Sequence, residues 1–562
     1  MKRCPQCGRE YDNTMMFCLD DGAELLYGPV SADEVRTAIL PGDELPSEEA
    51  TKKEIEENGN SNKPAREENA NIRKSRLPVA LIFAGCVALL SFGGYAIFKY
   101  WTQPGTTLKS VAVLPFANAS GDSSFDYLSD GLSESVLDRL AQLPQIKVIA
   151  RDSSFKYRGG NVNLKEAANA LGVNTLVTGR VSQRGDILSV RVEMVDVLED
   201  RQLWSESYDR QARDIQAIQA EIAQTVSEKL RIHLTGVQQQ QLAKTATANS
   251  EAYQVYLNGL FVSRTDLKSS LDHFIRASQL DPNFALTFYE ISRCYFYLGY
   301  NSDMDPKETT PKAITSLERA LELDNSLADA HALMSEIKRS KWDWAGANEE
   351  RQRAIDLAPN TPVAHSNKST QLADRNHFDE ALIEARRAQE LDPFKLGYQI
   401  QEVGIFLRAG RYDEAITKIQ QVIRLQPDKQ GPYMWLGYVL VAKGMYSEAI
   451  ATYRKGIEMH PGNTGDQCYL GHALAKGGGR NEALRILEEM KVSKAYVSPT
   501  DLAVLYVGLG DKEAAFRSLE EAFTKRDIQL QNLDSDSHFN ELHNDPRYDD
   551  LIRRIGLHNR SL

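Results

Sequence analysis

The feature that most constrains the fold of this chain is an internal period of 34 residues in its C-terminal half. Breaker residues recur at this interval, at Asn325, Pro359, Pro393, Pro427 and Pro461. Small residues recur at the same interval, at Ala313, Ala347, Ala381, Ala415, Ala449 and Ala483. A unit with one close-approach position and one breaker predicts two short helices joined by a turn. Such a hairpin cannot bury its apolar face alone, so the units are expected to stack into a solenoid.

One unit of this series can be compared with a known family. Residues 432–461 read PYMWLGYVLVAKGMYSEAIATYRKGIEMHP, with Leu436 and Gly437 in the first helix and Ala449 and Tyr453 in the second. The length and pattern resemble the tetratricopeptide repeat family. The resemblance implies an all-α right-handed superhelix with a concave groove.

The repeats can be extended in both directions along the chain. Weaker units on either side predict about eight hairpins over residues 250–535. A polar capping helix is expected over residues 536–562, with His538 and His543 in contact with solvent.

The groove of this family binds a protein or peptide partner. The first-helix positions that face the groove in the family fall at Ile400, Met434, Tyr438, Cys468 and His472. None of the five is Lys, Arg or Asn, the types that grip a terminal carboxylate in such arrays. We therefore predict a groove for an apolar or aromatic peptide segment. The same side chains packing between helices is the alternative interpretation.

A long apolar segment precedes the repeats. Residues 77–98 carry no charge, and a helix of this length at about 1.5 Å per residue crosses the roughly 30 Å hydrocarbon layer of a bilayer. We expect a single transmembrane helix that embeds the chain in a membrane, preceded by a disordered acidic linker over residues 29–76. The basic residues that flank the span on its N-terminal side are Arg66, Arg73, Lys74 and Arg76. This bias predicts a cytoplasmic N-terminus and a C-terminal region on the far side.

The first 28 residues hold a cluster of potential metal ligands. Cys4 and Cys7 form a C-x2-C pair, Cys18 follows, and Asp21 stands where a fourth cysteine completes such a pattern. The cluster resembles the short zinc-ribbon family, which implies one structural zinc ion per chain. A decayed ribbon that no longer closes around metal is the alternative, since a carboxylate replaces a thiolate.

Residues 108–235 alternate strand and helix signals, which predicts a mixed α/β domain. A β-hairpin is expected to turn at Arg184, Gly185 and Asp186. The runs SVAVLPFANASGD, DYLSDGLSESVLDRLAQLPQIKVIARDSSF and LGVNTLVTGRV resemble the TolB-like amino-terminal domain family. That resemblance implies a bacterial inner-membrane protein with this domain in the periplasm, and it implies no chemistry.

The function class follows from what the chain contains. Its 562 residues require several domains, and a net charge of −12 disfavours nucleic acid as a partner. No catalytic motif such as H-E-x-x-H or G-x-S-x-G occurs, so we expect no enzyme. The sequence favours a membrane-anchored interaction scaffold or assembly factor of the bacterial envelope. A receptor or membrane-bound regulator that relays outside binding to a cytoplasmic partner of the ribbon is the alternative. No oligomeric state is indicated.

Overall fold

The computed structural model describes residues 2–3, 10–11, 26–27, 109–159, 162–263, 265–300, 304 and 306–559. The chain divides into two compact units, Met1–Thr107 and Leu108–Leu562. In the first unit, β1 (Lys2–Arg3), β2 (Glu10–Tyr11) and β3 (Leu26–Tyr27) form an antiparallel sheet in the order β2–β1–β3. The metal residues predicted from sequence, Cys4, Cys7, Cys18 and Asp21, lie outside the described residues, as does the linker.

The prediction of a membrane-spanning helix requires correction. Among the residues that the structure describes, no helix is both long and apolar enough to cross a bilayer. The longest of them, α10 (Pro306–Leu323), carries Lys, Glu and Arg along its length, and such charges are costly in lipid. The expected span, residues 77–98, lies outside the described part of the chain. The fold class with one transmembrane helix and the single-pass inner-membrane location are therefore withdrawn.

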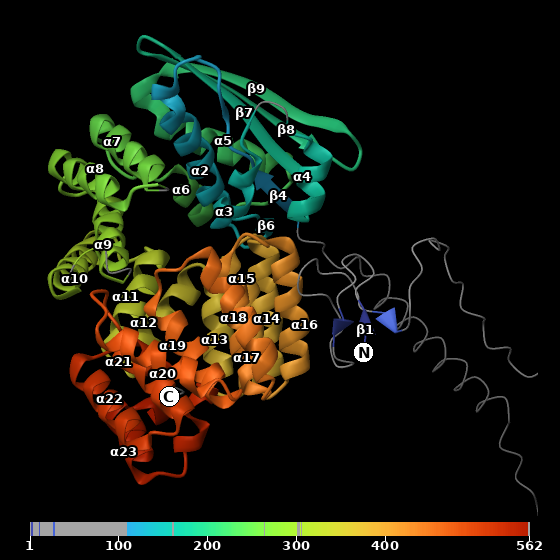
Figure 1. The fold of residues 1–562 in the computed structure, drawn as a ribbon. Helices are drawn as coiled ribbons and strands as arrows, with labels where there is room; N and C mark the ends of the chain where they lie inside the picture. Colours follow the sequence, from blue (N-terminus) through green and yellow to red (C-terminus); the bar gives the residue numbers. More distant parts are fainter. Residues whose placement is uncertain are drawn as a thin grey trace, which may run out of the picture. The chain divides into compact units, whose positions relative to one another are not determined.

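The α/β domain begins the second unit and is built on a mixed sheet (Figure 1). The parallel part pairs β4 (Lys109–Val113) with β6 (Ile146–Val148) on one side and with β7 (Thr175–Arg184) on the other. The short β5 (Ala117–Asn118) also pairs with β7. Three long antiparallel strands complete the sheet, as β7 pairs with β8 (Ile187–Asp196) and β8 with β9 (Arg201–Gln211). The turn between β7 and β8 lies at Gly185 and Asp186, as the sequence predicts.

Helices cover both faces of this sheet. Alternation along β4 sends Val111 and Val113 to one core, and Ala112 and Leu114 to another. The first core lies under α2 (Asp126–Ala141) and α5 (Ile215–Lys229), which pack on each other. The second lies under α4 (Leu164–Leu171). In the sequence, α3 (Arg151–Ser154) and the 3₁₀ turn η2 (Phe155–Tyr157) lie between α2 and α4. After α5, the helix α6 (Gly236–Ala243) leads into the repeats.

In the part of the chain that the structure describes, eight helical hairpins follow, in line with the repeat pattern, which predicts about eight (Figure 1). They are α7 (Ser250–Val262) with α8 (Leu267–Leu280), α9 (Ala285–Tyr300) with α10, α11 (Ala328–Ser340) with α12 (Trp344–Leu357), α13 (Pro362–Asp374) with α14 (Phe378–Leu391), α15 (Leu396–Arg408) with α16 (Tyr412–Leu425), α17 (Gln430–Ala442) with α18 (Tyr446–Met459), α19 (Thr464–Lys476) with α20 (Arg480–Lys491), and α21 (Pro499–Leu509) with α22 (Lys512–Lys525).

The period in the sequence has a direct structural meaning. The six alanines of the series are at most 1% exposed, because the paired helices touch at these positions. In five successive hairpins, from α11–α12 to α19–α20, the inner turn places a residue at positive φ, and this position also recurs every 34 residues. Gly410, Gly444 and Gly478 occupy it in later repeats, while Asn376 and Trp342 occupy it in earlier ones. Glycine adopts this conformation without steric cost, so Trp342 requires a compensating contact.

The α/β domain docks on one turn of the repeat array. The Ser153 hydroxyl donates to the buried carboxylate of Asp392 and accepts from the backbone N–H of Phe394 at 2.9 Å. The Ala150 N–H donates to the carbonyl of Leu391 at 2.8 Å. Burial raises the pKa of Asp392 to about 6. Asp392 belongs to the periodic turn between hairpins, so the repeat pattern also supplies the docking residue.

Candidate partner-binding groove

The inner side of the array carries a cavity of about 830 Å³ that is partly open to solvent. First helices of successive hairpins, α13, α15, α17, α19 and α21, provide most of its wall. Aromatic side chains on the wall are Tyr398, Trp435, Tyr438, Tyr453 and Tyr469. A concave cavity of this size, lined by several aromatic side chains and a number of polar groups, is typical of a ligand or peptide site.

The five groove residues predicted from sequence separate into two groups. Ile400, Met434 and Tyr438 line the cavity. Cys468 and His472 are 0% and 3% exposed and lie behind the wall, between helices. The Nδ1 atom of His472 lies 3.0 Å from the carbonyl oxygen of Val504. Burial, assisted by the nearby His538, lowers the pKa of the His472 imidazole to about 3, so this side chain is neutral at physiological pH.

The wall includes a second periodic series that the sequence analysis did not select. Gln401, Trp435 and Tyr469 line the cavity and are each one residue beyond Ile400, Met434 and Cys468. Successive residues of an α-helix are rotated by about 100° around its axis. A shift of one position along the sequence is therefore enough to move from a side chain packed between helices to one that faces the cavity. In α19 the helix is turned so that Tyr469 faces the cavity and Cys468 faces the core.

Charged side chains also line the cavity, beside the largely uncharged positions predicted from the sequence. Arg339, Arg408 and Asp374 contribute to the wall, and Arg408 donates to Asp374 at 3.0 Å. Asp466, Asp501 and Asp536 also line it. The cavity therefore combines an aromatic surface, a paired Arg408–Asp374 contact and several acidic groups.

One side of the cavity is formed by residues that follow the last hairpin. We call residues 526–557 the closing segment. It contains η4 (Ile528–Asn532), η5 (Ser537–Leu542) and α23 (Pro546–Ile555). The Tyr438 hydroxyl donates to Asp536 at 2.5 Å, which brings η5 against the inner helix α17.

His538 shows how deeply the closing segment enters the array. Its ring lies 4.6 Å from the ring of Tyr438, 5.0 Å from that of Tyr469 and 4.7 Å from that of His472, measured between centroids. The residue is 2% exposed, so the expectation that it contacts solvent is wrong, whereas His543 is exposed as expected. Aromatic partners from α17 and α19 replace water around the imidazole.

The closing segment also reaches back to an early hairpin. The Trp344 indole N–H donates to the carbonyl of Ile555 at 2.8 Å. Trp342 packs on Phe523 with ring centroids 5.3 Å apart, and the Arg526 guanidinium lies 4.4 Å above the Trp342 ring. These contacts explain a tryptophan at a turn position that suits glycine, because burial of the indole offsets the backbone cost. They join the two ends of the cavity wall.

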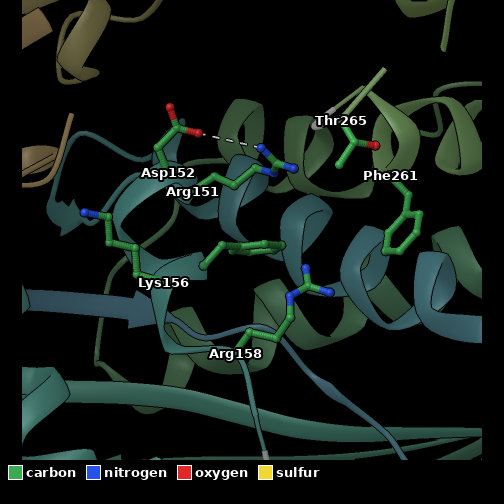
Figure 2. A pocket seen from close by; sticks show the side chains of 7 residues that line it. Arg151, Asp152, Lys156, Arg158, Phe261 and Thr265 are labelled. Atoms are coloured by element: carbon green, nitrogen blue, oxygen red, sulfur yellow. Dashed lines mark ion pairs between the residues drawn. The ribbon is translucent and has the colours of Figure 1, made fainter. Parts of the chain in front are cut away.

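A smaller cavity of about 400 Å³ lies where α3 and η2 meet α7 (Figure 2). Figure 2 shows the ion pair between Arg151 and Asp152 on its wall. Arg151 also pairs with Glu134 at 2.7 Å, and Arg158 pairs with Asp130. Lys156 lies 4.2 Å from the centroid of the Phe394 ring. Each cation on this wall already has a partner within the protein. The ion pairs of Arg151 and Arg158 lie within the α/β domain, while Lys156 contacts Phe394 of the repeats.

The repeats match a known family. The tetratricopeptide repeat family model matches residues 405–464, which span parts of α15 to α19. The chain thus contains tetratricopeptide repeats over residues 405–464.

Other similarities are more distant. The chain is 29% identical over 283 residues to putative adenylate cyclase 3 of Rhizobium meliloti (strain 1021), covering 48% of this chain and 41% of that protein. The chain thus spans less than half the length of this curated relative. Among solved structures, yeast Tom70 is 15% identical with a TM-score of 0.35, covering 55% of this chain and 68% of its own. PilW, a type IV pilus biogenesis factor, is 16% identical with a TM-score of 0.32, covering 39% of this chain and 96% of its own.

Proposed function

We propose that this chain is a protein-interaction scaffold or assembly factor that holds an extended segment of a partner protein in the cavity of its repeats. The observation that carries the proposal is the partly open cavity with aromatic side chains on its wall, supplied mainly by the inner helices of the repeats and the closing segment. Aromatic side chains provide large contact area at little cost in conformational entropy, and they dominate the energetics of protein interfaces.

The proposal describes a protein that acts by binding, not by catalysis. The polar groups that meet in the cavity are carboxylates, guanidinium groups, amides and hydroxyls, spread over several helices. The His472 imidazole, which could act as a base, is buried behind the wall. Binding of a peptide segment needs only shape and complementary polar contacts.

The test is to fill the cavity without disturbing the helices. Gly404 lines the cavity, and a Cβ added there meets only Trp435, at 3.9 Å. Gly404→Phe in the full chain therefore places a ring in the cavity. The matched control is Gly236→Phe, because a Cβ at the exposed Gly236 of α6 meets nothing within 4 Å.

Binding is measured by fluorescence anisotropy with a library of acetylated nonapeptides of random sequence. We expect a subset of peptides to bind the wild-type chain and the Gly236→Phe variant equally, and to lose binding to Gly404→Phe. Peptides that bind all three proteins equally would contradict the proposal, as would a library with no binder. Melting temperatures of the variants show whether both remain folded.

A further inference from the structure

The acidic groups of the cavity lie close together although they come from different elements. Asp466 is on α19, Asp501 on α21 and Asp536 in the closing segment. A Cβ built on Gly465 would lie 2.7 Å from an Oδ atom of Asp501, which places that carboxylate against α19 beside Asp466. Among the described residues, neither Asp466 nor Asp501 forms an ion pair with Lys or Arg. Asp466 accepts a hydrogen bond from the Gln430 amide.

The cations of the cavity do not neutralise these acids. Arg408 donates to Asp374 at 3.0 Å. Arg339 donates to the side-chain oxygen of Gln531 at 3.3 Å. The guanidinium groups are thus engaged with other residues. Within the described residues, the polar groups that act on the two carboxylates are Gln430 and His460 at Asp466 and Tyr469 at Asp501, and no Lys or Arg forms an ion pair with either.

The negative charge of these two carboxylates is unfavourable in the folded protein. Burial, followed by the charges of Asp527, Asp536 and Asp466, raises the pKa of Asp501 to about 7. Burial raises the pKa of Asp466 to about 6. A cation that enters from outside stabilises both carboxylates by direct attraction in a setting of low dielectric constant.

Unpartnered hydroxyl groups provide a second and independent observation. Tyr453 and Thr500 both line the cavity and are 1% and 3% exposed. Neither hydroxyl has a hydrogen-bond partner among the described residues. Leaving a buried hydroxyl unpaired costs about 1–3 kcal/mol, so such groups at a cavity wall indicate a missing ligand atom.

The position of Tyr453 depends on a glycine in the neighbouring helix. Tyr453 is on the outer helix α18, and its ring passes over Gly437 of α17. A Cβ at Gly437 would lie 2.4 Å from that ring. The glycine therefore allows an outer-helix side chain to reach the cavity, where its hydroxyl can accept a hydrogen bond from a ligand.

Aromatic rings complete the surroundings. The rings of Trp435 and Tyr438 are 5.9 Å apart, and those of Tyr438 and Tyr469 are 6.2 Å apart, between centroids. Continuous aromatic faces attract cations, and they also pack against the methylene groups of lysine or arginine.

We propose that the bound segment carries a basic side chain whose cationic group is held by the carboxylates of Asp466 and Asp501 and by the hydroxyls of Tyr453 and Thr500. The inference rests on the proposed function, because it specifies the partner of the same cavity. It requires a partner with lysine or arginine at the bound position. The opposite arrangement, a groove that grips a carboxylate, does not fit these residues.

The experiment uses the full chain and the peptide library, with every lysine peptide also made with ε-N-acetyl-lysine. The variants are Asp466→Asn and Asp501→Asn. The control is Asp272→Asn on α8, which makes the same substitution at an exposed carboxylate outside the cavity. We expect each cavity variant to weaken lysine peptides by at least about tenfold, which corresponds to about 1.4 kcal/mol. Acetylation should weaken binding to the wild type similarly, and Asp272→Asn should have no effect.

The outcomes separate this inference from the proposed function. If Gly404→Phe abolishes binding while acetylation and both cavity Asn variants change nothing, the groove binds a partner but the basic-side-chain inference is wrong. If Gly404→Phe leaves binding intact, the proposed function is wrong and this inference falls with it. Loss of binding in Asp272→Asn equal to that in the cavity variants would show a long-range charge effect and would also overturn the inference.

Discussion

The inner hairpins and the closing segment both line the cavity, but they are encoded differently. In the hairpins the same contact recurs at the repeat interval. The Ser335 hydroxyl donates to the carbonyl of Ala347, and Ser369 does the same to Ala381, both at 2.8 Å. The closing segment instead makes single contacts over long separations, such as Trp344 with Ile555, 211 residues apart.

The difference shows how stability and function divide within a repeat protein. Contacts between neighbouring repeats add up along the array and tolerate variation in any one unit. The closing segment has no repeated counterpart, and its few contacts hold it against the inner helices, where it lines one side of the cavity. We therefore expect changes at the closing contacts to affect the cavity more than changes of similar size elsewhere.

The largest effect is expected from Trp344→Ala. Trp344 is 6% exposed, and its removal deletes both the packing of the ring and the hydrogen bond to Ile555. Loss of a large buried side chain costs about 3–5 kcal/mol. Urea denaturation followed by circular dichroism measures the change.

The control is Trp204→Ala on β9, a half-buried indole that donates to Glu206 at 3.2 Å. Trp204→Ala should lower the free energy of unfolding clearly less than Trp344→Ala does. Equal losses in the two variants would show that closure contributes no more than an ordinary surface tryptophan.

A smaller effect is expected inside a repeat, at Gly437→Ala. The added methyl group would meet the Tyr453 ring at 2.4 Å, and overpacking of this kind costs up to about 3 kcal/mol. At Gly404 the nearest atom is 3.9 Å away, so Gly404→Ala should stabilise its helix by about 0.5–1 kcal/mol. Thermal melts of the two variants should shift in opposite directions. Two shifts of the same sign would refute the close approach of α17 and α18.

The docking of the α/β domain should respond to Ser153→Ala. This change leaves the Asp392 carboxylate and the Phe394 N–H without their partner, at a cost of about 1–2 kcal/mol. Ser189→Ala is the matched control, because it removes the same type of bond, to Asp209, on the exposed surface of the sheet. Denaturation should show almost no change for the control. A comparable loss in both variants would mean that the docking contact is not buried in solution.

The smallest effect is a pH-dependent gain from Asp501→Asn. The pKa of Asp501 is raised in the folded state to about 7, so the folded protein binds more protons than the unfolded chain between about pH 4 and 7. Stability from this group therefore decreases as pH rises through that window. The Asn variant does not lose stability as pH rises, because an amide does not ionise. Burial of its amide offsets part of the resulting gain in stability.

We expect a net gain of about 1 kcal/mol at about pH 8 and none at about pH 4. Melting curves of the two proteins across this range supply the measurement. A gain that does not change with pH would contradict a raised pKa for Asp501.

The sequence predicts the repeats well because each requirement is local and recurs. The small residue at Ala449, the breaker at Pro461 and the glycine at Gly444 each satisfy a need within one hairpin. The β-hairpin at Gly185 is predictable for the same reason. Strand β9 was not expected, because RQLWSESYDRQ has little apolar alternation and is held by its pairing with β8.

The site is only partly predictable from the sequence. Ile400, Met434 and Tyr438 line the cavity, but Cys468 faces the core because a small rotation of α19 exchanges it with Tyr469. The acidic group of Asp466 and Asp501 depends on how successive hairpins stack, and the role of Asp536 depends on the closing segment. Neither feature has a periodic signal.

The most direct test of the central claim is hydrogen exchange of the full chain with and without a peptide selected from the library. If the partner binds in the cavity, amides of the inner helices α15, α17 and α19 and of the closing segment should exchange more slowly with peptide bound. Amides of the outer helices α16 and α20 should be unchanged. Protection confined to the outer helices or to the α/β domain would contradict binding in the cavity.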